Sequence, residues 1–176
     1  GLHFAESALT LAALGQPGKS EEAIEGFRRL TFLQPRFWLT QFLLGRAYVE
    51  TGEPGRAPEA YSAAIDLDPL SPFLYDRRAE AYDLLGKHDL VVDDYGRSIK
   101  LSPEESARYV HRGVALFALG GVEEAIQDFD QAIQLDSQDV RAFIGRGTAH
   151  KALGEHHQAI EDFNEAIRLD PGLAAG

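Results

Sequence analysis

Apolar residues recur along this chain in paired stretches, and within each stretch they are spaced by three and four positions. Between residues 72 and 86, for example, Tyr75, Ala79 and Tyr82 fall on one side of a helix. A second stretch follows at once, where Val91 and Tyr95 begin a new stripe of the same kind. The pattern therefore predicts pairs of amphipathic helices along the whole chain.

The pairs repeat with a fixed period of 34 residues and no insertion. One glycine stands between the two stretches of every pair: Gly18, Gly52, Gly86, Gly120 and Gly154. The second stretch of each pair carries one aromatic residue at the same repeat position: Phe27, Tyr61, Tyr95, Phe129 and Phe163. Because glycine adopts the left-handed conformation at little cost, we expect each of these glycines to end the first helix of its repeat. A period of this length with two helices per unit indicates a stacked array.

The repeat frame fixes the expected organisation of the chain. We expect a single array over residues 4–173, with terminal tails at 1–3 and 174–176. Its repeats are 4–37, 38–71, 72–105, 106–139 and 140–173. Small residues in the first helices, such as Gly45 and Gly113, leave room for the aromatic residue of the second helix. In the second repeat, Pro54 and Pro58 predict a second helix that begins no earlier than about Arg56.

Two columns of charge change together between repeats. The third, fourth and fifth repeats carry an arginine in the first helix and an aspartate sixteen residues later, where the second has Leu44 and Ala60. The pairs are Arg78 with Asp94, Arg112 with Asp128, and Arg146 with Asp162. We expect a partly buried ion pair that joins the two helices of a repeat. The alternative is that both columns are solvated surface charges.

A short series of residues gives the repeat its family resemblance. The fourth repeat reads Tyr109, Arg112-Gly113, Leu116, Ala125, Phe129 and Ala132, with Ser137 where the other repeats have proline. This series resembles the tetratricopeptide repeat, and the resemblance extends over all five units. It implies an all-α, right-handed α-α superhelix of ten antiparallel helices, whose first helices line a concave groove. It also implies a non-enzymatic scaffold that binds a peptide or helix of a protein partner in that groove.

The groove residues that the resemblance implies are the first-helix positions that vary between repeats. They are Leu39, Phe42, Arg46, Val49, Phe73, Asp76, Arg77, Glu80, Asp83, Val110, His111, Val114, Phe117, Arg141, Ile144, Thr148 and Lys151. The first repeat offers only Ala5, Ala8 and Ala12, so we expect it to form a wall of the groove. The family's clamp for chaperone carboxyl termini needs lysine and asparagine in slots that here hold residues such as Asp76 and Val110, so that role is not supported.

Three of the groove positions form an acidic stripe. Asp76, Glu80 and Asp83 are spaced by four and three, so they share one helix face. Because apolar positions flank them, we expect a ligand with apolar anchors and a central lysine or arginine. The alternative is that Arg46 neutralises Glu80 across the groove and that Arg77 does the same for a neighbouring acid.

Composition narrows the class of partner. The formal charge of −11 disfavours nucleic acid and anionic membrane surfaces. No stretch approaches the ~20 apolar residues that a membrane-spanning helix needs. These features favour a soluble protein, in the cytoplasm rather than in a membrane, although the sequence does not specify the compartment. The absence of any methionine leads us to expect a piece of a longer chain.

Two other classes of function were weighed against the binding scaffold. An enzyme or metal site would have to use His150, His156 and His157, but the last two are adjacent at a turn and diverge, and no catalytic motif is present. We therefore expect no catalytic residue, cofactor or metal. Self-association is the other alternative, because Ile144, Ile160 and Ile167 would leave apolar surface bare on the last helix pair. We therefore expect either that the protein continues past Gly176 or that this C-terminal end forms a homo-oligomer.

Overall fold

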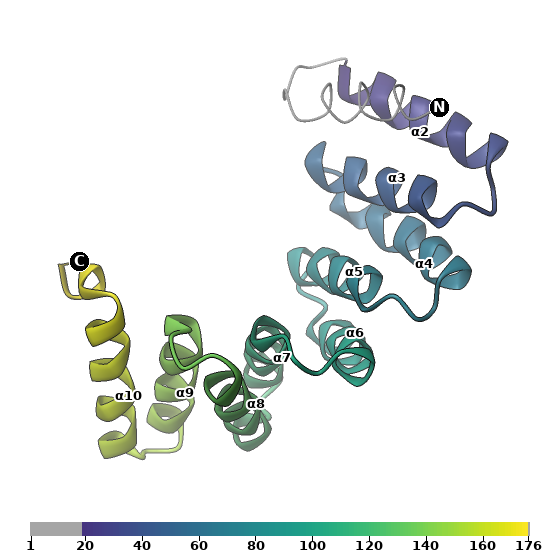
Figure 1. Ribbon diagram of the computed structural model, residues 1–176. Coiled ribbons are helices and arrows are strands. Elements are labelled where there is room, and N and C mark those ends of the chain that lie inside the picture. The colour runs from purple at the N-terminus through teal and green to yellow at the C-terminus, as the bar shows by residue number, and fades with distance from the viewer. Residues whose placement is uncertain (1–18, 176) are drawn as a thin grey trace. The chain divides into compact units, whose positions relative to one another are not determined.

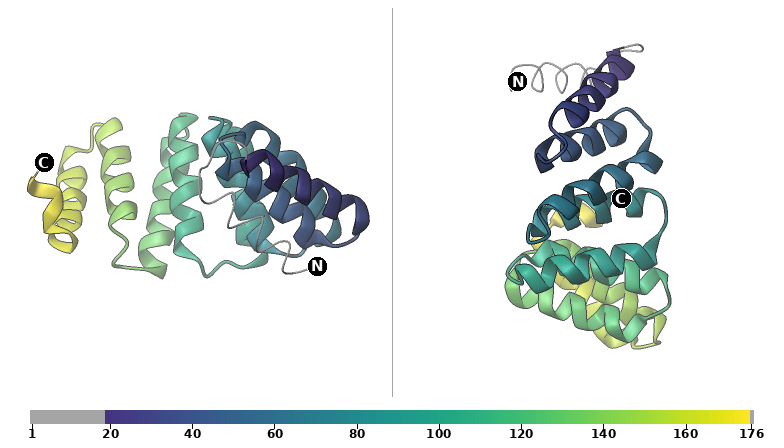
Figure 2. Two further views of the ribbon diagram at one scale, coloured as in Figure 1. Left: turned by 90° about the horizontal axis from the view of Figure 1, so that it is seen from above. Right: turned by 90° about the vertical axis from the view of Figure 1, so that its right-hand side faces the viewer.

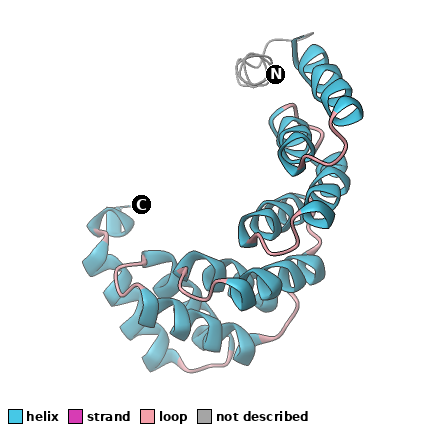
Figure 3. Cartoon of the chain, turned by 45° about the vertical axis from the view of Figure 1, so that its right-hand side comes forward, coloured by secondary structure: helices cyan, strands magenta, loops and turns pink. Residues whose placement is uncertain are grey.

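The computed structural model describes residues 19–175, and within them it contains nine α-helices and no strand (Figure 1, Figure 3). The helices are α2 (Lys19–Leu33), α3 (Trp38–Glu50), α4 (Ala57–Leu67), α5 (Pro72–Leu84), α6 (His88–Leu101), α7 (Ser106–Ala118), α8 (Val122–Leu135), α9 (Val140–Ala152) and α10 (His156–Leu169). Two 3₁₀ turns, η1 (Pro54–Arg56) and η2 (Pro171–Ala175), complete the elements. The expected first helix of the first repeat, with Ala5, Ala8, Ala12 and Gly18, lies outside the described residues, as does most of the two tails.

The chain divides into two compact units, residues 1–87 and 88–176. In the first unit α2, α3, α4 and α5 pack on their neighbours in sequence, and in the second α6 to α10 do so (Figure 1, Figure 2). The boundary falls inside the third repeat, between α5 and α6. The helix order is the predicted one, whereas a single continuous array over 4–173 stays a prediction. None of the described helices combines the length and apolar character needed to cross a membrane.

Glycine ends the first helix of each described repeat as predicted. Gly52, Gly86, Gly120 and Gly154 all have positive φ, between 66° and 87°. They are the only residues of the described chain in that conformation. A side chain would be strained there, so the 34-residue glycine column reflects a requirement of the backbone.

The small-residue column of the first helices makes room for the aromatic column of the second. A Cβ on Gly45 would lie 2.7 Å from the Tyr61 ring, and one on Gly113 would lie 2.9 Å from Phe129. Phe129 is also approached by Gly145 of the next repeat, where a Cβ would lie 2.5 Å away. Each aromatic ring is therefore held against bare backbone, which confirms the predicted packing of small on large.

The second helix of the second repeat begins late, as its prolines predict. Pro54 lies in η1, and α4 starts at Ala57 with Pro58 in its first turn. The missing amide of Pro58 costs nothing there, because the first-turn amides of a helix have no partner within the helix. With 11 residues, α4 is shorter than the second helices α6, α8 and α10, which have 14 each.

Two of the three predicted arginine–aspartate pairs are present, both in the second unit. Arg112 donates to both carboxylate oxygens of Asp128, at 2.8 and 2.6 Å. Arg146 does the same to Asp162, at 2.6 and 3.0 Å, and also contacts Asp130 of the preceding repeat. The aspartate side chains are nearly buried, so these are not solvated surface pairs.

The third predicted pair stays untested, because Arg78 and Asp94 belong to different units. Within the first unit, Arg78 donates to the Ser62 hydroxyl at 2.8 Å. Ser62 occupies the same position of its repeat as Asp130, the second partner of Arg146. Arg78 and Arg146 therefore both contact a residue of the preceding repeat.

Candidate functional site

In the first unit, α3 and α5 present a cluster of aromatic rings. The Phe42 and Phe73 ring centroids are 5.0 Å apart, and Trp38 lies 6.3 Å from Phe42 on the other side. Phe73 keeps 41% of its surface exposed, whereas Phe42 is only 8% exposed and belongs to the core of the unit. The prediction that Phe42 offers an anchor on the surface is therefore wrong; its ring supports Phe73 from beneath.

Two ion pairs flank this cluster, and each lies within one helix. Arg77 contacts Glu80 at 2.7 Å on α5, and Arg46 contacts Glu50 at 2.6 Å on α3. The expectation that Arg77 neutralises a neighbouring acid is confirmed. The expectation that Arg46 neutralises Glu80 is wrong, because Glu50 lies one turn further along α3 and is closer at hand.

The hydroxyl of Tyr61 lies under these charges. Burial raises the pKa of Tyr61 to about 12, while Arg77, the strongest of the surrounding charges, partly opposes this shift. Burial also raises the pKa of Glu80, and Arg77 again opposes the shift. The Arg77 guanidinium lies 5.3 Å from the Phe73 ring centre, within reach of a cation–π contact. The buried Tyr61 side chain therefore lies close to both ion pairs, Arg77 with Glu80 and Arg46 with Glu50.

Arg77 therefore offsets part of the negative charge of the acidic stripe on α5, through its ion pair with Glu80. Within this stripe the Asp76 side chain is half-buried and the Asp83 side chain is exposed. Leu39 and Val49 of α3 are partly buried against the core and border the same surface. We call this surface the first-helix face of the first unit; it comprises Leu39, Arg46, Val49, Phe73, Asp76, Arg77, Glu80 and Asp83.

In the second unit, α7 and α9 carry the corresponding surface. Val114 is 51% exposed and Ile144 is 37% exposed, so both apolar side chains meet solvent. Val110 is only 3% exposed and lies in the core with Phe129, so its predicted place on the surface is wrong. The first-helix face of the second unit therefore comprises His111, Val114, Phe117, Arg141, Ile144, Thr148 and Lys151.

Polar members of that face are held by local contacts. Arg141 donates to both oxygens of Asp139, at 3.0 and 2.8 Å, and this guanidinium holds the pKa of the Asp139 carboxyl below its usual value. Asp139 also caps α9 by accepting from the Arg141 amide. The His111 ring stacks on Tyr95 with centroids 5.4 Å apart. The sequence reading missed Asp139 and Tyr61, although an aspartate directly before a helix is a recognisable cap signal.

The histidines of the last repeat make pairwise contacts. His150 Nδ1 lies 2.5 Å from Glu155, and His157 lies 3.5 Å from Glu161 one turn away. Within the described residues, no group of three or more histidine and carboxylate side chains is arranged to hold a metal ion.

Three family models match the chain, and all describe tetratricopeptide repeats. They match residues 6–72, 113–154 and 140–173. A curated relative, the small glutamine-rich tetratricopeptide repeat-containing protein 2 of Mycosarcoma maydis, is 40% identical over 50 residues. That match covers 28% of this chain and 14% of the relative, so it concerns only a small part of the other protein.

Solved structures of the same fold align with nearly the whole chain. A MamA crystal structure matches with a TM-score of 0.82 and 23% identity, over 90% of this chain and 93% of its own. MamA from Desulfovibrio magneticus RS-1 matches with the same TM-score, 17% identity and 96% coverage of both chains. YrrB, described as a TPR protein with an unusual peptide-binding site, matches at 0.81 with 18% identity, over 96% of this chain and 85% of its own. At these identities the likeness concerns the fold, which is the all-α superhelical one that the family resemblance implies.

Proposed function

We propose that this chain, which belongs to the tetratricopeptide repeat family, is a non-enzymatic scaffold that binds a segment of a partner protein on its first-helix faces. The observation that carries the proposal is the exposure of large apolar side chains beside charged ones on α5, α7 and α9. Phe73, Val114 and Ile144 remain exposed there although each unit has a core of its own. Exposed apolar side chains rimmed by polar groups are a common feature of protein-binding surfaces.

The first unit supports the proposal through its rigid aromatic anchor. Phe73 packs against Phe42, and the Arg77 guanidinium lies over its ring. An aromatic ring and an arginine held in place lose little conformational freedom on binding, and both residue types are enriched among the residues that dominate interface energies. A peptide-binding site is named for YrrB, one of the structures with this fold, which agrees with a peptide ligand here.

The charges on α5 specify the ligand further. The acids that would meet a cation are Asp76, Glu80 and Asp83, which share one face of α5, and Glu80 also contacts Arg77. The proposed ligand therefore has apolar side chains for Phe73 and the α3 surface, and a lysine or arginine that reaches the α5 carboxylates. The second unit, with Val114 and Ile144, would take further apolar side chains of the same class.

The test is a selection of binding peptides from a displayed library with the full chain. We expect the selected peptides to share a lysine or arginine flanked by apolar residues. Charge reversal by Asp76→Lys and Asp83→Lys should weaken their binding by about tenfold or more, which corresponds to ~1.4 kcal/mol. The control reverses two exposed acids of the second helix α6, Asp89→Lys and Asp93→Lys, with the same change in net charge.

Equal loss of affinity in both double variants would show that only the net charge matters. Full affinity of the Asp76→Lys, Asp83→Lys variant would contradict the acidic stripe and leave the apolar side chains alone. Thermal melting of both variants controls for unfolding.

Self-association is a second candidate, favoured by the exposed isoleucines of α10. Ile160 is 59% exposed and Ile167 is also exposed, so α10 carries apolar surface that a second copy could cover. Sedimentation equilibrium of the chain and of an Ile160→Gln, Ile167→Gln variant tests this candidate. A dimer that the substitutions convert to monomer supports it, and a monomeric parent chain contradicts it.

A further inference from the structure

The carboxyl-terminal half of α2 and the turn after it differ from the corresponding part of every other repeat. Three positions of this stretch, spaced by four, carry Arg28, Phe32 and Arg36. The second repeat has Ser62, Asp66 and Leu70 there, and the third has Gly96, Lys100 and Glu104. The fourth has Asp130, Gln134 and Gln138, and the fifth has Asn164, Arg168 and Gly172. Only the first repeat combines two arginines with an aromatic residue at these positions.

The aromatic residue is not taken up by the core. Phe32 is 84% exposed, the highest value among the large apolar residues that are exposed in the described chain, and its neighbour Leu33 is 71% exposed. Phe37, which follows the turn, is 45% exposed. The other repeats place a polar or charged side chain at the Phe32 position, as expected for a position in contact with water. An exposed phenylalanine there is therefore not a requirement of the repeat fold. A cluster of exposed apolar side chains is a feature of interaction surfaces.

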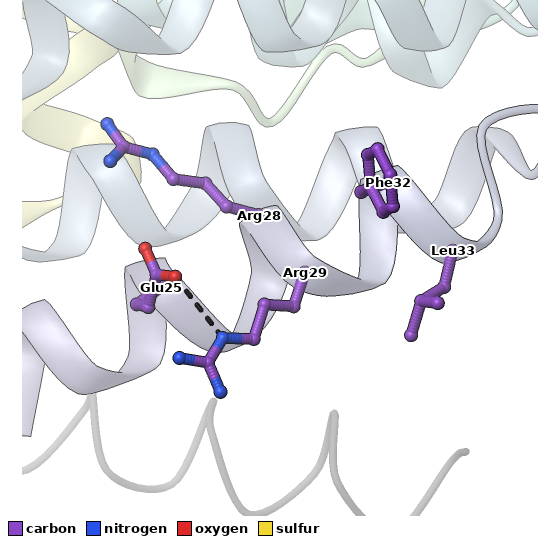
Figure 4. A pocket seen from close by; sticks show the side chains of 5 residues that line it. All are labelled: Glu25, Arg28, Arg29, Phe32 and Leu33. Carbon is purple, nitrogen blue, oxygen red and sulfur yellow. Dashed lines mark hydrogen bonds and ion pairs between the residues drawn. The ribbon is translucent and has the colours of Figure 1, made fainter.

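These side chains line two shallow depressions that follow one another along the chain. The first is lined by Glu25, Arg28, Arg29, Phe32 and Leu33, which Figure 4 shows along one length of α2. The second is lined by the turn residues from Gln34 to Phe37. We call Arg28, Arg29, Phe32, Leu33, Arg36 and Phe37 the α2 patch.

The α2 patch is basic in a strongly acidic protein. Residues 26–38 contain three arginines and no acid, whereas the whole chain has 17 basic and 28 acidic residues. Arg29 is paired with Glu25 at 3.2 Å, and both side chains are more than half exposed. Arg28 donates to a neutral group, the Tyr48 hydroxyl, at 3.2 Å. The Tyr48 hydroxyl, and after it the charges of Glu25 and Glu53, raise the pKa of Arg28. Among the described residues, however, no carboxylate forms a direct ion pair with Arg28 or Arg36.

We propose that the α2 patch is a second binding surface, which takes an acidic protein segment with aromatic or aliphatic anchors. The guanidinium groups provide forked donors that match carboxylates, and Phe32 with Leu33 provides the apolar contact. Arginine is enriched among the residues that dominate interface affinity, and phenylalanine is enriched at interfaces. An anionic bilayer would bring an extended layer of negative charge against a protein of net charge −11, whereas a short acidic segment meets only the patch, which disfavours the bilayer as the occupant. This surface lies on a second helix, so it is separate from the first-helix faces proposed above.

The probe for this proposal is a short fluorescein-labelled peptide of Glu-Glu-Leu-Phe repeats, with a Gln-Gln-Leu-Phe peptide for comparison. We expect the full chain to bind the glutamate peptide at least about tenfold more tightly in fluorescence anisotropy, and the difference to shrink as salt is added. The Arg28→Ser, Phe32→Gln, Arg36→Gln variant, which takes its residues from the corresponding positions of other repeats, should lose at least about tenfold in affinity for it.

The control variant removes the same number of positive charges elsewhere. Arg97→Gln and Lys100→Gln change two exposed cations of α6, where Lys100 occupies the same repeat position as Phe32. We expect this control to keep its affinity within about twofold, since exposed charges that do not contact the peptide are screened. The Asp76→Lys, Asp83→Lys variant should also keep it, which separates this surface from the first-helix face. Melting curves show that all variants fold.

Four results would overturn the proposal. They are equal affinity for the glutamate and glutamine peptides, equal loss in the triple variant and its control, binding to phosphatidylserine vesicles without binding to the peptide, and a dimer of the parent chain that the triple variant dissolves.

Discussion

The arginine–aspartate pair of the fourth repeat provides a quantitative test of the packing between the first and second helices. Arg112 donates two charge-assisted hydrogen bonds to Asp128, at 2.8 and 2.6 Å. The Arg112 side chain is 25% exposed and the Asp128 side chain is 7% exposed. The charge that remains after removal of its partner is therefore more hydrated for Arg112 than for Asp128. The two single substitutions should accordingly differ in how much they lower the free energy of unfolding.

Arg112→Leu leaves a carboxylate that is almost shielded from water, and breaking a buried pair in this way costs about 3–5 kcal/mol. Asp128→Ala leaves a guanidinium that is still partly hydrated, so we expect a smaller cost of about 2 kcal/mol. The double variant recreates the apolar pair Leu44 and Ala60 of the second repeat, both of which are buried. Because replacement of a buried ion pair by packed apolar residues is often neutral, we expect the double variant to stay within about 1 kcal/mol of the parent.

The assay is a double-mutant cycle of urea unfolding followed by far-ultraviolet circular dichroism. The costs above imply a coupling energy of at least about 4 kcal/mol between the two positions. The control cycle uses Asp93→Ala and Arg97→Leu, two exposed side chains one turn apart on α6, with an expected coupling below about 0.5 kcal/mol. A coupling below about 0.5 kcal/mol for Arg112 and Asp128 would show a solvated surface pair and refute the buried seam.

Three further predictions concern packing, capping and titration. Gly45→Ala should destabilise the first unit by about 1–3 kcal/mol in thermal melting, because its Cβ would lie 2.7 Å from the Tyr61 ring, whereas Gly55→Ala, with no atom within 4 Å, should change little. Asp139→Ala should cost about 1 kcal/mol by loss of the α9 cap, and Glu105→Ala, at the same repeat position before α7 but without a capping bond, should cost less than half of that; equal costs would contradict the capping role. Tyr61 should ionise at about pH 12 in an ultraviolet titration. Because the folded state holds this proton more tightly than the unfolded chain, the contribution of Tyr61 to stability should fall as the pH rises above about 10. Ionisation of all tyrosines near pH 10 would contradict the buried site.

The periodic features of the fold could be predicted because each depends on one residue type at one repeat position. The left-handed glycines, the late start of α4 and the pair of Arg112 with Asp128 follow from local backbone conformation or from two columns that change together. The repeat frame compares positions with one another, so it separates structural residues from variable ones without any homologue. Two compact units, in contrast, could not be predicted, because the period continues unchanged through the third repeat at their boundary.

The candidate surface was predicted less well, because a helix stripe does not show how deep each side chain lies. Phe42 and Val110 share the spacing of their exposed neighbours, yet neighbouring helices bury both. The partner of Arg46 was also misassigned, since a carboxylate one turn away on α3 competes with one on another helix. Glu50 was not among the predicted groove positions, although it lies one turn after Arg46 on the same face of α3. Phe32, which no stripe includes, became visible only through its exposure.

The most direct test of the proposed scaffold is methyl nuclear magnetic resonance of the full chain with a peptide selected by display. Exposed or half-exposed methyl groups lie on the first-helix faces at Leu39, Val49, Val114 and Ile144, and elsewhere at Leu70 and Ile160. The account predicts that the peptide shifts the first set and leaves the second unchanged. Shifts confined to the second set, or spread equally over both, would contradict binding on the first-helix faces.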